Sequence, residues 1–329
     1  MSITQHRFLG LFLSALAALV LTTIPQYSFA DNYPTKPITI ITPVAPGSPF
    51  DQLTRLFAER LGRKLKTTVI IENATGGQAM VATKKVLNAS ADGYTLFMTS
   101  SGLATTPLIV KDAGYVLEDF APIAPLGQAP YILFVSASVK ATDIPSLMKE
   151  IKERGKALNH GVLTSSHLSV VLSKKMAVTA GGEPYEEVGY KGSPQMSAAL
   201  LADDVQMIGT TYSIVGPHLK GGKVKAIGVL GRERSVHMPE LKTFIESGYE
   251  DIYINVWAAL YTKAAVPKDI SDKLRSASAE IISEPSYRAA MVLTGSEFWN
   301  IRVEDMQPAF YKEAEIFKRD MEKFKLKFD

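Results

Sequence analysis

The sequence has 329 residues, of which 46% are hydrophobic and 21% are charged, and its formal net charge at pH 7 is +3. It contains no cysteine, which excludes disulfides, thiolate metal ligands, a cysteine nucleophile and a lipid-modified cysteine anchor. A net charge this close to zero argues against a nucleic-acid partner. A chain of this length is ample for a buried core and suggests two lobes rather than one.

The amino terminus has the pattern of a cleaved signal peptide. An apolar run at residues 8–23 follows a short stretch that carries His6 and Arg7. Small residues at Ser28 and Ala30 then occupy the positions that a signal peptidase needs, so we expect residues 1–30 to be removed. An uncleaved membrane anchor is the alternative, but the apolar run is short for a membrane span.

The stretch from Pro37 to Leu65 predicts a strand, a loop and a helix. Residues 38–42 are β-branched throughout and favour a buried strand. Ser48 then has the place of a helix N-cap, with Pro49 at the first helical position and Asp51 at the third. Free N–H groups at such a helix start favour an anion, so a carboxylate or phosphate ligand is the first hypothesis.

Strand and helix patterns alternate along most of the remaining chain, which indicates an α/β fold with mostly parallel sheets. In chain order we expect a strand at 68–72, a helix at 79–88, strands at 94–98 and 131–136, a helix at 144–156, a strand at 161–163, a helix opened by residues 164–167, strands at 204–210, 225–230 and 255–261, and helices at 268–282, 285–293 and 303–325.

Three loops between these elements are rich in small hydroxyl and glycine residues. They follow expected strands at residues 43–48, 99–102 and 164–167. Open α/β sheets bind ligands at the carboxyl ends of their strands. The three loops are therefore expected to meet at one cleft.

Eight short motifs also follow one another in a specific order. They are residues 33–38 (YPTKPI), Asn73 with Gly76-Gly77, 92–96 (DGYTL) followed by 100–102, 118–123 (EDFAPI), 190–192 (YKG), 217–218 with 221–226, 232–235 (RERS), and Trp257 with Val266-Pro267. In this order they resemble the periplasmic solute-binding proteins of tripartite tricarboxylate transport systems, the Bug or TctC family.

The resemblance implies a type II periplasmic-binding-protein fold, in which two α/β lobes are joined by hinge strands and enclose a ligand cleft. Lobe 1 would comprise residues 31–130 and 254–329, and lobe 2 would comprise residues 131–253. The resemblance further implies a periplasmic monomer that catalyses no reaction and needs no cofactor or metal. Such a protein captures a small carboxylic acid and delivers it to the membrane permease subunits of a tripartite tricarboxylate-type transporter. A receptor that feeds a sensory system would have the same fold and stays open as an alternative.

The ligand-binding residues that we expect from the loops and the resemblance lie in the three loops, in two further turns and at one strand end. They are Val44, Ala45, Gly47, Ser48, Phe50, Asp51, Thr99, Ser100, Ser101, Thr164, Ser165, Ser166, His167, Tyr190, Lys191, Thr210, Thr211 and Trp257. The anion would be held by the backbone N–H groups of Ala45, Gly47 and Ser48. Alternative roles are a helix cap for Ser48 with Asp51, a structural hydrogen bond for His167, and a place in the core for Trp257.

Departures from the family's pattern bear on the ligand. The first loop carries Phe50 where the family has small residues, which adds an aromatic ring near the cleft. Where the family commonly has an acidic residue after the strand that ends at Met207, this chain has Gly-Thr-Thr at residues 209–211. An added ring and a missing acid suit a ligand without an ammonium group. We therefore expect an aromatic or other non-amino carboxylic acid.

A serine hydrolase is the enzymatic alternative, because Ser48, Asp51 and His167 are residue types of a catalytic triad. No G-x-S-x-G motif occurs in the sequence, and Pro49 directly after the serine has no N–H for an oxyanion hole. No two histidines are spaced i, i+4 and no H-E-x-x-H motif occurs, which argues against a metal site.

Overall fold

The computed structural model describes residues 32–163, 167–181, 185–254 and 256–326. The expected signal peptide lies outside this part of the chain, as do Thr164, Ser165 and Ser166 of the expected ligand set. Within the described ranges, no helix is both long and apolar enough to cross a membrane.

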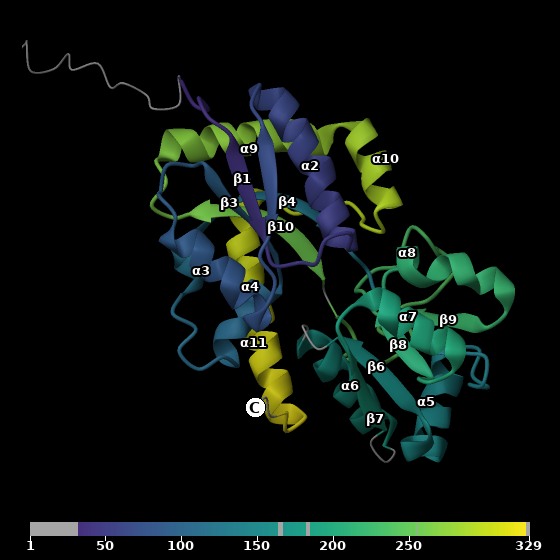
Figure 1. Cartoon of the computed structure of the whole chain (residues 1–329). Helices are drawn as coiled ribbons and strands as arrows, with labels where there is room; N and C mark the ends of the chain where they lie inside the picture. The colour runs from purple at the N-terminus through teal and green to yellow at the C-terminus, as the bar shows by residue number, and fades with distance from the viewer. Residues whose placement is uncertain (1–31, 164–166, 182–184, 255, 327–329) are drawn as a thin grey trace, which may run out of the picture.

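The strands form two five-stranded sheets, one in each of two lobes (Figure 1). Their bounds are β1 Ile38–Thr42, β2 Val69–Asn73, β3 Thr95–Ser100, β4 Phe120–Gln128, β5 Ile132–Ser136, β6 Asn159–Leu163, β7 Glu186–Tyr190, β8 Met207–Thr210, β9 Val224–Val229 and β10 Trp257–Lys263. The first sheet has the order β2-β1-β3-β10-β4 and the second has the order β7-β6-β8-β5-β9.

Both sheets are mixed, so the prediction of mostly parallel sheets was wrong. In the first sheet β1 pairs in parallel with β2 and β3, whereas β10 runs antiparallel to β3 and β4. In the second sheet β6 pairs in parallel with β7 and β8, whereas β5 runs antiparallel to β8 and β9. The chain leaves lobe 1 through β4 and returns to it through β10. Because both crossings lie at the same end of the sheet, these two strands must run in opposite directions.

The predicted helices lie close to their expected positions, with boundaries that shift by a few residues. Their bounds are α2 Pro49–Leu65, α3 Met80–Asn88, α4 Gly102–Thr105, α5 Ile144–Arg154, α6 His167–Ala180, α7 Ser193–Ala202, α8 Tyr212–Val215, α9 Lys268–Ser283, α10 Pro285–Leu293 and α11 Val303–Lys323. Short 3-10 turns join several of them, including Gly77–Ala79 before α3 and Thr106–Leu108 after α4. The helices α4, α7 and α8 were not predicted.

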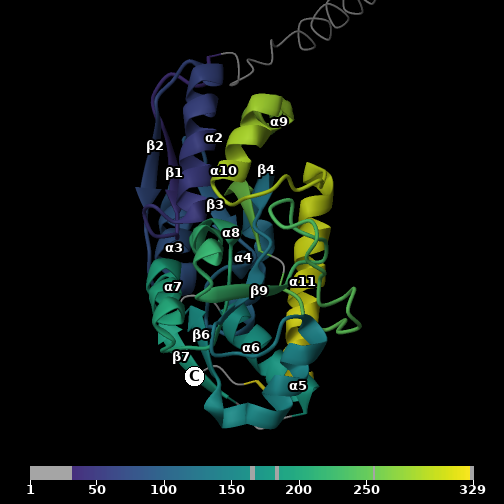
Figure 2. The same cartoon turned by 90° about the vertical axis from the view of Figure 1, so that its right-hand side faces the viewer.

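Helices cover both faces of each sheet, as is usual for α/β proteins (Figures 1 and 2). In lobe 1, α2, α9 and α10 pack on one face, while α3 and the first turns of α11 pack on the other. Successive residues of β1 divide between these two cores, since Ile40 belongs to the first and Ile41 to the second. In lobe 2, α5 and α6 cover one face of the sheet, and α7 covers the other.

Sequence reasoning missed β4, and its place in the sheet explains why. The segment contains Pro122, Pro125 and Gly127, which read as a loop. β4 is the last strand of the first sheet and has a neighbour on one side only. Proline is tolerated in an edge strand because the side of the strand without a neighbour needs no backbone N–H donor. The edge strand β7 was also missed, and so was α7.

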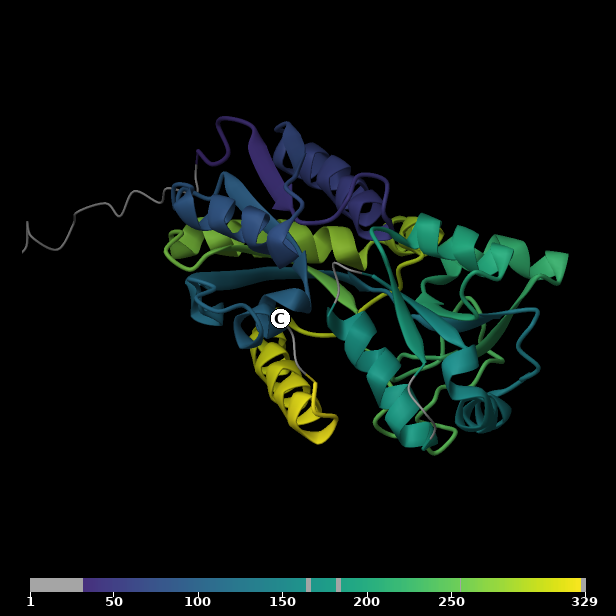
Figure 3. The same cartoon turned by 60° about the horizontal axis from the view of Figure 1, so that its bottom comes forward.

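Two antiparallel crossings join the lobes. The crossings pair with each other, since the N–H of Ala129 donates to the carbonyl of Val256 at 2.7 Å. Leu230 of lobe 2 binds both of them, because its N–H donates to the carbonyl of Tyr131 at 2.7 Å and its carbonyl accepts the N–H of Ile254 at 2.7 Å. The long helix α11 makes a third connection, because it starts in lobe 1 and its last turns reach α6 of lobe 2 (Figures 1 and 3). Phe317 of α11 packs there against Val171 of α6.

Candidate functional site

A cavity of about 650 Å³ lies between the lobes at the carboxyl ends of β1, β3 and β8. Both lobes and both crossings contribute to its wall. It is lined by Pro43, Val44, Ala45, Ser48, Pro49, Phe50, Thr75, Gly76, Gly77, Gln78, Ala79, Thr99, Ser100, Ser101, Gly102, Thr105, Thr106, Ala129, Tyr131, Leu163, Leu168, Lys191, Gly192, Ser193, Thr210, Thr211 and Val256. We refer to this cavity as the cleft.

The first loop reaches the cleft as predicted, with Val44, Ala45, Ser48 and Phe50 in its wall. Ser48 caps α2, because its hydroxyl oxygen accepts a hydrogen bond from the N–H of Asp51 at 3.3 Å. The ring of Phe50 is 9% exposed at the cleft edge of the lobe 1 core. Strand, loop and helix therefore have the arrangement that the sequence indicates.

Asp51 points away from the cleft and ties this loop together. Its carboxylate accepts hydrogen bonds from the N–H of Gly47 at 2.8 Å, from Asn73 Nδ2 at 2.8 Å and from Arg55 Nε at 2.9 Å. Although burial favours the neutral acid, the bonds from Arg55 and Asn73 lower the pKa of Asp51. A carboxylate so fully engaged cannot orient a histidine, which argues against the hydrolase alternative.

The anion-binding role predicted for three backbone N–H groups needs correction for two of them. The N–H of Gly47 is bound by Asp51, and the N–H of Ser48 donates to the carbonyl of Ala45 at 3.2 Å. Among the described residues, no acceptor is bound to the N–H of Ala45, which lines the cleft. Gly47 itself does not line it. Its φ of +76° suits glycine and gives the loop the turn that brings its N–H to Asp51.

Residues 75–79 form a cleft wall that sequence reasoning recognised only as a glycine turn. Gly76, Gly77, Gln78 and Ala79 all have positive φ angles, of 115°, 53°, 55° and 73°. Two consecutive non-glycine residues in the left-handed region are unusual, and such strained backbone tends to cluster at functional sites. The glycine pair was the available signal, but it does not show that the left-handed turn continues through Gln78 and Ala79.

The next loop and the lobe 2 wall supply hydroxyl groups. Thr99 and Ser100 end β3, Ser101 follows it, and all three line the cleft, as predicted. Opposite them, Thr210 ends β8 and Thr211 follows it, and the hydroxyl of Thr211 lies 3.1 Å from that of Ser213.

Lys191 is the one charged residue among the lining residues in the described part of the chain, and none of those residues is acidic. It is exposed and lies between the end of β7 and the start of α7. The ammonium group of Lys191 therefore gives the cleft a net positive lining. Such a lining can attract an anion, and it offers no carboxylate to an ammonium group.

Besides Gly47 and Asp51, two further predicted contacts lie outside the cleft lining. Trp257 is fully buried in the lobe 1 core, where its ring stacks on Phe310 at 4.1 Å and its Nε1 donates to Glu313 Oε2 at 2.8 Å. Trp257 therefore has a place in the core, which was its alternative role, and its prediction as a cleft wall is wrong. Tyr190 packs against the lobe 2 core and is not among the lining residues. His167 starts α6, and its side chain lies outside the described part of the structure.

The crossings add lining residues that sequence reasoning missed. Ala129 and Tyr131 of the first crossing and Val256 of the second form the floor between the lobes. Leu163 and Leu168 add apolar surface from lobe 2. No local pattern marks these residues, because they reach the cleft only when the two lobes come together.

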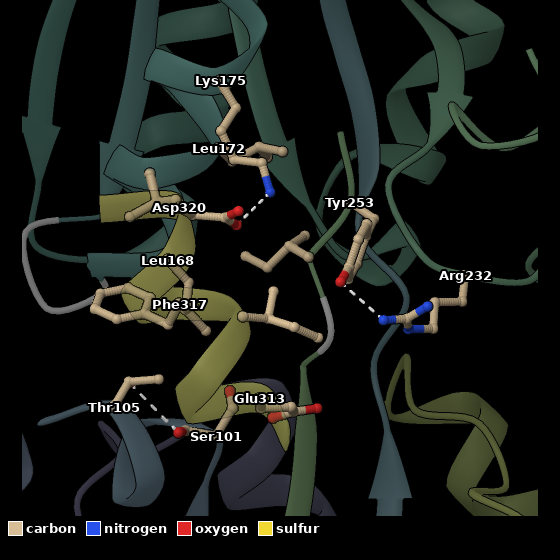
Figure 4. A pocket seen from close by; sticks show the side chains of 13 residues that line it. Ser101, Thr105, Leu168, Leu172, Lys175, Arg232, Tyr253, Glu313, Phe317 and Asp320 are labelled. Carbon is tan, nitrogen blue, oxygen red and sulfur yellow. Dashed lines mark hydrogen bonds and ion pairs between the residues drawn. The ribbon is translucent and has the colours of Figure 1, made fainter. Parts of the chain in front are cut away.

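A second, smaller cavity of about 60 Å³ lies behind the cleft (Figure 4). It shares Ser101, Thr105 and Leu168 with the cleft, and its other wall is α11. Lys175 and Asp320 face each other there across the lobe boundary.

Comparisons with known proteins agree with this architecture. The family model described as "Tripartite tricarboxylate transporter family receptor" matches residues 53–321. A protein of Bordetella pertussis (strain Tohama I) that carries the family name UPF0065 is 29% identical over 298 residues, which cover 89% of this chain and 91% of that protein.

Two solved structures are similar in fold. The periplasmic binding protein BugD has a TM-score of 0.78 and 24% identity, over 90% of this chain and 99% of that one. The R. palustris protein Rpa4515, solved with adipate, has a TM-score of 0.80 and 24% identity, over 89% of this chain and 98% of that one.

Proposed function

Because the chain belongs to the tripartite tricarboxylate transporter receptor family, we propose that it is a periplasmic solute-binding protein for a small carboxylic acid. After removal of residues 1–30 it would capture the acid in the cleft and deliver it to the membrane permease subunits of a tripartite tricarboxylate-type transporter. The structural relative Rpa4515, which was solved with adipate, supports an acid as the class of ligand.

The observation that carries this proposal is the charge of the cleft. Its lining has one ammonium group, Lys191, and no carboxylate among the described residues. The N–H of Ala45 and the hydroxyl groups of Thr99, Ser100 and Thr211 add donors for an anion. Donors and a cation around a largely apolar cavity are the complement of a carboxylate on an apolar body.

The same lining favours an acid without an ammonium group. An α-amino acid would bring a cation into a cleft in which no described residue offers it a carboxylate. Phe50, Leu163 and Leu168 instead offer apolar and aromatic surface. The cleft volume of about 650 Å³ lies within the range of roughly 300–1,000 Å³ that is usual for small-molecule sites. An aromatic or other non-amino carboxylic acid therefore fits best.

Capture works by closure of the two lobes. Ala45 belongs to lobe 1 and Lys191 to lobe 2, so an acid that contacts both is bound more tightly when the lobes approach each other. A ligand shifts a conformational equilibrium only by its difference in affinity between the two states. The closed form would then be the form that the permease recognises.

A thermal-shift screen of the chain from Asp31 onward tests this proposal. A ligand at 100 times its Kd stabilises the native state by about 2.7 kcal/mol, which moves the melting midpoint by a few degrees in a protein of this size. We expect shifts with one group of non-amino carboxylic acids and none with amino acids or sugars. A shift with aspartate alone would contradict the expected ligand class, and no shift with any acid would contradict the function.

A further inference from the structure

Tyr131 is placed where the chain crosses into lobe 2, directly before β5. Its carbonyl accepts the N–H of Leu230 at 2.7 Å, which fixes its backbone at the crossing. Its side chain lines the cleft beside Ala129 and Val256. Tyr131 is the tyrosine of the cleft floor, and the function proposed above assigns it no role.

The phenol of Tyr131 is a hydrogen-bond donor that the described residues leave without a partner. Two other tyrosines donate to backbone carbonyls: Tyr33 to Gly93 at 2.6 Å and Tyr115 to Leu103 at 3.0 Å. Burial raises the pKa of Tyr131 to about 12, so its oxygen keeps its proton at neutral pH. Tyr131 is half-buried, so water can satisfy this hydroxyl in the free protein, and a ligand that displaces the water can offer an acceptor in its place.

The ring of Tyr131 lies beside the neighbouring strand. At Gly209 of β8, an added Cβ would lie 3.9 Å from Cδ2 of the tyrosine ring, which is an ordinary van der Waals distance. β5 pairs with β8 so that Ile132 lies opposite Thr210, which places Tyr131 at the strand end where the cleft threonines lie.

The order of the strands separates Tyr131 from two of the anion-binding groups, the N–H of Ala45 and the ammonium group of Lys191. In the first sheet the loop with Ala45 follows β1, which lies two strands away from β10 at the crossing. In the second sheet Lys191 follows β7, which lies three strands away from β5. Neighbouring strands lie about 4.8 Å apart, so the backbones at the two ends of the cleft lie roughly 10 Å or more apart. A ligand whose carboxylate is bound by Ala45 and Lys191 therefore reaches Tyr131 with its opposite end.

We propose that Tyr131 donates a hydrogen bond to a second oxygen at the far end of the bound acid. The inference rests on the function proposed above and narrows its ligand class. The preferred ligands would be acids that carry a hydroxyl or a second carboxylate across an apolar body. Tyr131 would then be a specificity-determining residue, which contributes to the choice among acids rather than to carboxylate binding itself.

Calorimetric titration with two matched pairs of acids tests this role. The pairs are 4-hydroxybenzoate with benzoate, and adipate with hexanoate. At the end opposite the shared carboxylate, the first member of each pair carries a hydroxyl or a second carboxylate that the second member lacks. We expect the oxygen-bearing member of at least one pair to bind about tenfold more tightly to the wild-type protein. Tyr131→Phe removes a single oxygen atom and should abolish this preference, while the affinity for the plain member stays within about twofold.

A control variant and two contradicting outcomes complete the test. Tyr249→Phe removes a hydroxyl from a tyrosine that packs on Phe244, away from the cleft lining, and should leave both affinities unchanged. Equal loss for both members of the pair in Tyr131→Phe, or no loss, would overturn the inference while leaving carboxylate binding in place. If none of the four acids binds to the wild-type protein, the ligand class inferred here fails, and the thermal-shift screen of other acids decides whether the proposed function fails as well.

Discussion

Lys175 of α6 and Asp320 of α11 form an ion pair across the lobe boundary, with 2.6 Å between Nζ and Oδ2 (Figure 4). Their side chains are 2% and 4% exposed. Burial lowers the pKa of Lys175, and the hydrogen bond to Asp320 opposes that shift. Arg319 and Lys323 of α11 also pair with Asp251 of lobe 2, so the end of α11 is attached to the second lobe.

Breaking this buried pair on one side should destabilise the protein. Lys175→Met leaves the carboxylate of Asp320 buried without its ammonium partner, and we expect a loss of about 3 kcal/mol in the free energy of unfolding. The double variant Lys175→Met with Asp320→Leu should recover most of that loss. Urea denaturation of the three proteins measures the difference. Lys174→Met, at an exposed neighbour, is the control and should change little. Equal stability of wild-type and Lys175→Met proteins would contradict the role of the pair.

A buried histidine should make the stability depend on pH. His160 in β6 is 1% exposed, and burial lowers its pKa from 6.5 to about 4. Between these values the unfolded chain binds a proton that the folded protein does not bind, so stability falls as pH decreases from about 6.5 to about 4. The total loss from this group is roughly 3 kcal/mol.

Replacement of His160 by Gln should flatten this dependence. The measurement is the free energy of unfolding from urea titrations at several pH values between about 4.5 and 7. The exposed His218→Gln serves as the control and should keep the wild-type slope. If the slope of His160→Gln equals that of the wild type, His160 is not the group that titrates.

The first loop of the cleft, residues 43–48, should depend on Asp51 for its shape. Asp51→Ala removes the acceptor of the Gly47 N–H and of Asn73, and we expect a loss of about 2–3 kcal/mol together with weaker acid binding. Arg55→Ala removes one partner from the surface and should cost less than about 1 kcal/mol. Denaturation and calorimetry on both variants provide the comparison. An Asp51→Ala protein as stable as wild type would show that the loop holds without the carboxylate.

Parts of the fold could be read from local sequence, and parts of the site could not. The N-cap at Ser48 and the start of α2 follow from residues within one turn of each other. The prediction that Trp257 lines the cleft was wrong for a general reason. In a strand, successive side chains point to opposite faces of the sheet, but the sequence does not show which face meets the cleft. Tyr131 was recognised only as the beginning of a strand. Its place in the cleft depends on Val256, which is distant in sequence, and on contacts between the lobes.

A charge placed on the lobe 2 wall should repel an anionic ligand. Thr211 lines the cleft and is 4% exposed. Thr211→Asp and Thr211→Asn have nearly the same shape and differ in charge, so any stability cost of the substitution is shared. We expect the Asp variant to bind the acid at least about tenfold more weakly than the Asn variant, with the difference shrinking at high salt. Equal affinities, measured by calorimetry, would remove Thr211 from the ligand's surroundings.

The most direct test of the account is a calorimetric comparison of acids with their neutral amides, using the chain from Asp31 onward. 4-Hydroxybenzoate and adipate have the shape of their amides but carry the charge that Lys191 and the N–H of Ala45 would recognise. We predict that at least one acid binds and that its amide binds about a hundredfold more weakly, or not at all. An amide that binds as tightly as its acid would contradict the claim that the cleft captures a carboxylate.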